Sequence, residues 1–119
     1  MDYEQGPVYE KSFQFALDIV ELYKILIAHK EYVFSKQLLR AGTSVGANIV
    51  EASAAYSKGD FAYRMSVASR EARETRYWLL LLKKSQLVPV RIANEIESCE
   101  ELMRLLTSIV KTSQESLNK

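Results

Sequence analysis

The stretch LLRAGTSVGANIVE, residues 38–51, decides the fold. It contains no proline, and its side chains are small around Gly42 and Gly46, which lie four residues apart. A glycine inside a helix costs about 1 kcal/mol relative to alanine, so both glycines need an offsetting gain. Close packing of a second helix against the glycine face is the simplest gain. The stretch therefore predicts a tight helix assembly, and the alternative is that the glycines are merely tolerated.

Apolar residues recur every three or four positions on both sides of this stretch, and no period-two strand pattern competes. They predict four helices over about residues 9–28, 33–55, 58–84 and 89–113, with Pro89 in the first turn of the last, where its missing N–H costs nothing. Short connections favour antiparallel neighbours, so we predict an all-α, up-down-up-down antiparallel four-helix bundle. Residues 1–119 are expected to form a single domain, with a loose N-terminal arm at 1–8 and a frayed tail at 114–119.

The first predicted helix carries two apolar stripes that lie about 120° apart on a helical wheel. Together they are wider than one core-facing side requires. The second stripe therefore needs a cover, either another helix of the same chain or a second subunit. The first stripe consists of Phe13, Ala16, Val20, Tyr23 and Ile27, and the second of Phe15, Ile19, Leu22 and Leu26.

Composition excludes several classes of protein. The net charge is +1, so no global field drives binding to nucleic acid or to an anionic membrane. The longest apolar run, residues 77–82, is far shorter than the roughly 20 residues of a membrane span. The acidic, polar N-terminus does not resemble a secretory signal, so we expect a cytoplasmic protein. Cys99 is the single cysteine, which excludes an intrachain disulfide and argues against a cysteine zinc site.

Polar side chains fall on or near the apolar faces of the second and third predicted helices. Asn48 lies on an apolar face, Glu51 lies at its edge, and Glu71 points partly inward on the wheel. Because buried polar and charged groups need partners, we predict a structural polar network that fixes the register of the helices. Its predicted members are Arg40, Asn48, Glu51, Glu71 and Glu74.

An acid or metal cluster of Glu51, Glu71 and Glu74 is the functional alternative. Di-metal sites in bundles combine glutamates with Glu-x-x-His pairs, and the single histidine, His29, has no glutamate three residues before it. Cys99 falls in an apolar stripe, where a free thiol behaves as a small hydrophobic group. Phosphate-loop and hydrolase motifs are also missing. We therefore expect no catalytic, metal-binding or cofactor-binding residues and infer no small-molecule substrate.

Charge is unevenly distributed along the chain. Residues 58–84 carry seven basic and three acidic side chains. Arg70, Arg73, Tyr77 and Lys84 share an outward helix face, and such a stripe could follow a phosphate backbone. They form a candidate nucleic-acid face. The alternative is a solvated face whose bases pair with acids of the last helix.

Two segments resemble the 23S rRNA intervening-sequence proteins: QLLRAGTSVGANIVEA at residues 37–52 and SREARETRYWLLLL at 69–82, with a helix break between them. The shared patterns are R-A-x-x-S-x-x-x-N-I-x-E and E-x-x-Y-W-L-x-L, and the likeness covers about residues 11–113. The resemblance implies a bacterial four-helix bundle that assembles into a ring-like homopentamer, with no established enzymatic activity. A relative, the accessory variability protein of diversity-generating retroelements, is a basic pentamer implicated in binding nucleic acid and a reverse transcriptase.

Three functions follow as hypotheses. The first is a non-enzymatic, homo-oligomeric interaction or scaffold module. The second is an RNA- or DNA-binding accessory protein that uses the basic face, although this chain is near neutral where the basic relative is not. The third is an enzyme or metal carrier built on the glutamates.

Overall fold

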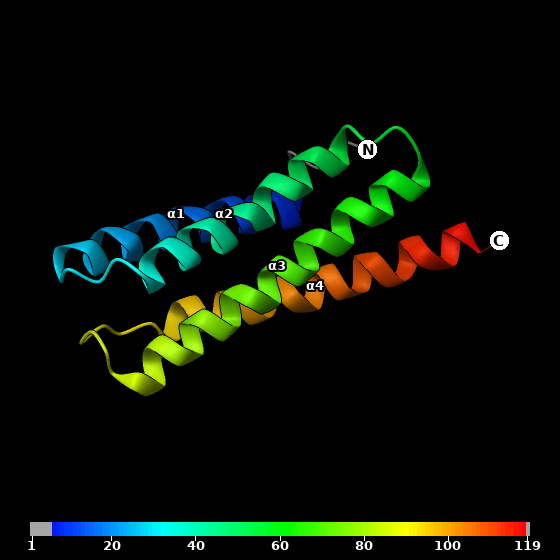
Figure 1. Cartoon of the computed structure of the whole chain (residues 1–119). Helices are drawn as coiled ribbons and strands as arrows, with labels where there is room; N and C mark the ends of the chain where they lie inside the picture. Colours follow the sequence, from blue (N-terminus) through cyan, green and yellow to red (C-terminus); the bar gives the residue numbers. More distant parts are fainter. Residues whose placement is uncertain (1–5, 119) are drawn as a thin grey trace.

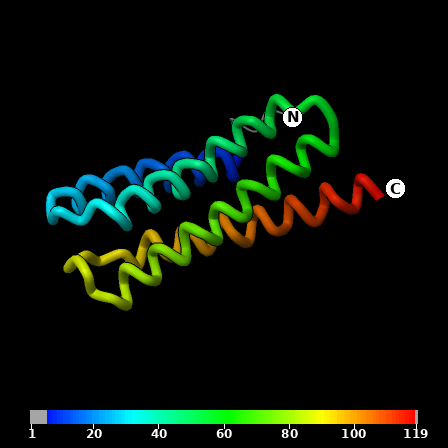
Figure 2. Tube along the Cα trace, viewed as in Figure 1, coloured from blue at the N-terminus to red at the C-terminus, as the bar shows by residue number. Residues whose placement is uncertain are grey.

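The computed structural model describes residues 6–118, which form four helices (Figure 1). These are α1 (Pro7–Ala28), α2 (Phe34–Ser53), α3 (Lys58–Ser85) and α4 (Ala93–Leu117). Helix α1 packs against α2 and α4, and α3 packs against the same two helices. The α1–α2 and α3–α4 connections lie at one end of the molecule and the α2–α3 connection at the other (Figure 2). The predicted all-α antiparallel four-helix bundle is confirmed.

The glycines of α2 lie against α1, as the close-packing prediction required. A Cβ built on Gly42 would lie 2.9 Å from both Cγ1 and Cγ2 of Ile19, which is closer than real Cβ contacts allow. A Cβ built on Gly46 would lie 3.4 Å from Ser12 Oγ, an ordinary contact distance. Gly42 is therefore required by the approach of α1, whereas Gly46 leaves room for a methyl group.

Helix α1 begins within the segment that was expected to be a loose arm. Gly6 is the N-cap residue and Pro7 occupies the first turn, where a proline is preorganised for the helix. Val8 is buried in the core and anchors this first turn. The expectation of an arm was wrong for residues 7–8, and residues 1–5 lie outside the described part of the chain.

Helix α4 differs from its predicted range at both ends. It begins at Ala93, and Pro89 lies in the connection that precedes it. Val88 and Ile92 are both buried, so the segment between them spans the end of the core and the helix starts only afterwards. At the other end, the helix continues to Leu117 because no glycine or proline stops it at the predicted boundary near Ser113.

The start of α2 is capped by a residue outside the helix, which the sequence did not indicate. The N-cap position, Val33, has no side chain that can accept a hydrogen bond. Instead, the Glu31 carboxylate accepts three backbone N–H bonds, from Val33 at 3.1 Å, Phe34 at 2.9 Å and Ser35 at 2.8 Å. These donors are the ones that a helix start leaves without intrahelical partners. Glu31 itself is buried, so it fixes the α1–α2 connection against the bundle.

Candidate interaction surfaces

One apolar stripe of α1 is only partly covered by the bundle. The bundle buries the second stripe, Phe15, Ile19, Leu22 and Leu26, whereas Phe13 of the first stripe is 54% exposed and Leu17, beside it on the helix surface, is 46% exposed. We call the surface made by Phe13, Ala16, Leu17, Val20 and Ile27 the α1 face. The helices of residues 6–118 cover this face only in part, because Ala16, Val20 and Ile27 are half-buried while Phe13 and Leu17 stay exposed. Exposed apolar surface of this kind marks interaction sites when it is contiguous.

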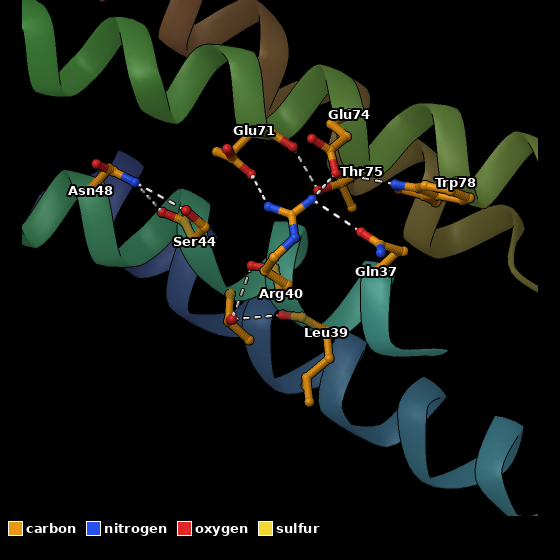
Figure 3. Close-up of polar contacts among 10 residues, drawn as sticks. Gln37, Leu39, Arg40, Ser44, Asn48, Glu71, Glu74, Thr75 and Trp78 are labelled. Carbon is orange, nitrogen blue, oxygen red and sulfur yellow. Dashed lines mark hydrogen bonds and ion pairs between the residues drawn. The ribbon is translucent and has the colours of Figure 1, made fainter. Parts of the chain in front are cut away.

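A polar cluster joins α2 to α3 around the Arg40 guanidinium (Figure 3). Its Nη1 donates to Glu71 Oε2 at 3.3 Å, and its Nη2 forms an ion pair with Glu74 and donates to Gln37 Oε1 at 3.3 Å. Trp78 Nε1 also donates to Glu74 Oε2, at 3.2 Å. One arginine thus bridges two carboxylates of α3, and an indole holds one of them in place.

Solvent reaches this cluster. The side chains of Arg40, Glu71 and Glu74 are 51%, 21% and 38% exposed. Ion pairs in such partly exposed positions contribute little stability because water screens them and ordering the side chains costs entropy. The cluster is thus better suited to orienting α2 relative to α3 than to stabilising the core.

The other two predicted network residues lie apart from the cluster. Asn48 Nδ2 donates within α2, to Ser44 O at 2.9 Å and to Ser44 Oγ at 3.1 Å (Figure 3). Ile49 and Ala52 face the core, and this rotation turns Glu51 out to solvent. The prediction that Glu51 lies at a buried edge was therefore wrong. The structure brings together Arg40, Glu71 and Glu74 only.

The groups that could support chemistry are scattered. Within residues 6–118, no three His, Cys, Asp or Glu side chains are grouped so that they could hold a metal ion. The Cys99 thiol is buried and donates to the Ala72 carbonyl oxygen at 3.1 Å. Burial raises its pKa to about 12, so the reactive thiolate is scarce at neutral pH. His29 is exposed at the end of α1, with its Nδ1 3.0 Å from the Ile25 carbonyl oxygen.

The candidate nucleic-acid face is exposed as the sequence suggested. Arg70, Arg73, Tyr77 and Lys84 all lie on the surface of α3. Neither Arg70 nor Arg73 forms an ion pair with any residue of the described range 6–118. The alternative, pairing with acids of the last helix, applies to Arg76, whose Nε lies 2.9 Å from Glu100 Oε2.

Arg73 also lines an open groove of about 450 Å³ between α3 and α4. The groove contains three basic side chains and no acidic one. Sequence reasoning missed its α4 half, although Arg104 and Lys111 are seven residues apart and therefore share one face of a helix. We call it the α3–α4 groove, and its lining residues are Arg73, Met103, Arg104, Thr107, Ser108 and Lys111.

Comparison with known proteins agrees with this architecture. The profile of the 23S rRNA-intervening sequence protein family matches residues 4–108. The chain belongs to this family. A crystal structure of a protein of unknown function from the S23 ribosomal protein family of Bacteroides thetaiotaomicron is 46% identical. The match covers 87% of this chain and 98% of that one, with a TM-score of 0.83. Comparison with curated protein sequences finds no match.

Neither the 23S rRNA-intervening sequence protein family nor this structural relative indicates an enzymatic activity. No helix of the described chain is long and apolar enough to cross a membrane. The candidate interaction surfaces of this chain are the α1 face, the polar cluster and the basic side of α3 and α4.

Proposed function

We propose that this protein is a non-enzymatic, self-associating helical bundle that acts as an interaction or scaffold module in the bacterial cytoplasm. The observation that carries the proposal is the α1 face, where Phe13 and Leu17 are each about half exposed. Assembly is expected to be homopentameric, in line with the resemblance to the family. The free thiol of Cys99 fits a reducing compartment.

Burial of the α1 face supplies the driving force. Transfer of apolar side chains out of water is worth about 25 cal/mol per Å², and interfaces of permanent oligomers are more apolar than ordinary surface. Lys24 is the single charged side chain within the arc that the α1 face covers. Such a surface is costly to leave in water, and a second copy can cover it.

Sedimentation velocity between 1 and 50 µM tests the proposal directly. The wild-type protein is expected to sediment as one oligomer, and Phe13→Ser with Leu17→Ser is expected to shift it toward monomer. Tyr63→Ser is a matched control, because Tyr63 is 56% exposed on α3 and lies outside the α1 face. Circular dichroism checks that each variant is folded. A wild-type protein that remains monomeric over the whole range would overturn the proposal.

Binding of RNA or DNA by the outer surface of α3 is the second candidate. The unpaired bases Arg70 and Arg73 favour it, together with the exposed Tyr77 between them and Lys84. Bases of a single strand can stack on tyrosine while arginine and lysine hold the phosphates.

Fluorescence anisotropy with a single-stranded RNA and a duplex DNA, repeated over a salt series, measures this binding. The double substitution Arg70→Ala and Arg73→Ala should weaken binding. It should also reduce the slope of log K against log salt concentration by about two. Lys30→Ala, an exposed base outside the face, should leave it unchanged. Binding that does not depend on salt, or that survives loss of both arginines, would rule out this surface.

A further inference from the structure

We infer that the α1 face of one copy docks into the α3–α4 groove of a second copy, with its acidic edge against the basic groove. This inference rests on the proposed self-association and names the surface that receives the α1 face.

The α1 face has an acidic edge. Glu10 lies seven residues before Leu17 and Glu21 lies four residues after it, so both carboxylates flank this exposed leucine on the helix surface. Both are exposed. Glu21 contacts only the exposed Lys24, at 3.1 Å, and Glu10 has no ion pair within residues 6–118. The edge therefore presents Glu10 without an ion pair in the described range and Glu21 held only by a solvent-exposed neighbour, so a basic partner can approach both carboxylates.

The α3–α4 groove is the receiving surface because its lining gathers three bases and no acid. At other contacts between helices, bases are paired with acids. Lys11 pairs with Glu101 at 2.8 Å, Arg76 pairs with Glu100 at 2.9 Å, and Arg40 pairs with Glu71 and Glu74. In the groove, Arg73, Arg104 and Lys111 line the walls without an acid. Bases held together in this way attract an acidic partner and repel a second basic groove.

The groove also offers apolar contact. Met103 is partly buried in its lining, and methionine adapts its shape to irregular partners. The aliphatic stems of arginine and lysine can cover apolar side chains while their charged ends reach the acids. An amphipathic helix with an acidic edge, such as α1, therefore suits the groove in charge and in apolar contact.

The two surfaces lie on different sides of a protomer. Helix α1 contacts α2 and α4 but has no packing contact with α3. Within one chain the α1 face therefore does not pack against the α3 wall of the groove. Each copy would offer one surface to one neighbour and the other surface to the next, which makes the contact head-to-tail.

Charge reversal tests this pairing. Glu10→Lys with Glu21→Lys reverses the edge, and Arg104→Glu with Lys111→Glu reverses the groove. All four side chains are exposed, so the fold should persist, and circular dichroism verifies it. Measured by sedimentation at 0.1 M salt, each pair alone is expected to raise the dissociation constant at least tenfold. The chain with all four substitutions should return to within about threefold of wild type, because the reversed charges again attract.

The matched control has the same net charge as the four-substitution chain. It combines the reversed groove with Glu51→Lys and Glu95→Lys, two acids that lie outside both the α1 face and the groove. Association is expected to remain weak in this chain. Recovery in the control, or failure of the four-substitution chain to recover, would overturn the inference. Wild-type association of the chain with only the reversed edge, or of the chain with only the reversed groove, would also overturn the inference. The proposed self-association would not be affected by that result. A monomeric wild type would instead overturn the proposed function and this inference with it.

Discussion

Helix α2 makes two different contacts from the same short stretch of sequence. Toward α1 it presents Gly42 and Gly46, and the contact is steric: backbone against the side chains of Ile19 and Ser12. Toward α3 it presents Arg40, and the contact is ionic: a long side chain that reaches Glu71 and Glu74 through partly exposed space.

The difference lies in how sharply each contact depends on distance. Close-packed atoms allow little adjustment, so even one added methylene changes the stability of the fold. A guanidinium on a flexible stem, in contact with solvent, can follow its partners over a larger range. The α1–α2 contact should therefore resist substitution strongly, and the α2–α3 contact should tolerate it.

The largest effect is expected from Gly42→Ala. The new Cβ would meet both Cγ atoms of Ile19 at 2.9 Å, so helix α1 or the isoleucine must shift. Overpacking of this kind costs about 2 kcal/mol, more than the gain in helix propensity. Urea denaturation should show the free energy of unfolding lowered by roughly 1 to 2 kcal/mol.

Gly46→Ala is the control for this prediction on the same helix face. Its Cβ would sit at an ordinary 3.4 Å from Ser12 Oγ, so the propensity gain of up to about 1 kcal/mol should appear as unchanged or increased stability. Equal losses in both variants would show that the α1–α2 contact is not sterically selective.

A smaller effect is expected at the start of α2, where Glu31→Ala removes the acceptor of three backbone N–H bonds. Loss of a helix cap costs about 0.5 to 2 kcal/mol, and the buried site hinders water from replacing the carboxylate. The midpoint of urea denaturation should fall, and hydrogen exchange at Val33, Phe34 and Ser35 should accelerate. Glu31→Gln retains one acceptor oxygen and should fall between wild type and alanine. Unchanged exchange in the alanine variant would contradict the role of Glu31.

Sequence patterns predicted most of the fold because they report periodicity. The spacing of Phe15, Ile19, Leu22 and Leu26 places them on one side of a helix, and the structure buries all four. Boundaries were less predictable where tertiary burial decides them. Val88 and Ile92 are buried in the core, and no local signal around Pro89 indicates that the helix begins only at Ala93.

The candidate surfaces were only partly predictable, for a related reason. Arg40, Glu71 and Glu74 meet as a helical wheel suggested, but Glu51 required knowledge of the rotation that puts Ile49 into the core. The α3–α4 groove combines Arg73 with Arg104 and Lys111, which are far apart in the chain. Periodicity places each residue on a face of its own helix but does not state which faces become neighbours. Glu31 was missed because it caps α2 from the preceding connection.

The smallest effect is expected from the ionic contact of α2. Arg40→Ala removes the bridge to Glu71 and Glu74, yet all three side chains are partly exposed, so the loss should stay below about 1 kcal/mol. A double-mutant cycle with Glu71→Ala isolates the interaction from other effects of each substitution. The coupling energy should shrink between 0.05 and 1 M salt, since solvent-exposed pairs are screened. A coupling above about 2 kcal/mol that salt does not reduce would place Arg40 with buried ion pairs. It would then match the steric α1–α2 contact in importance, and the contrast between the two sides of α2 would disappear.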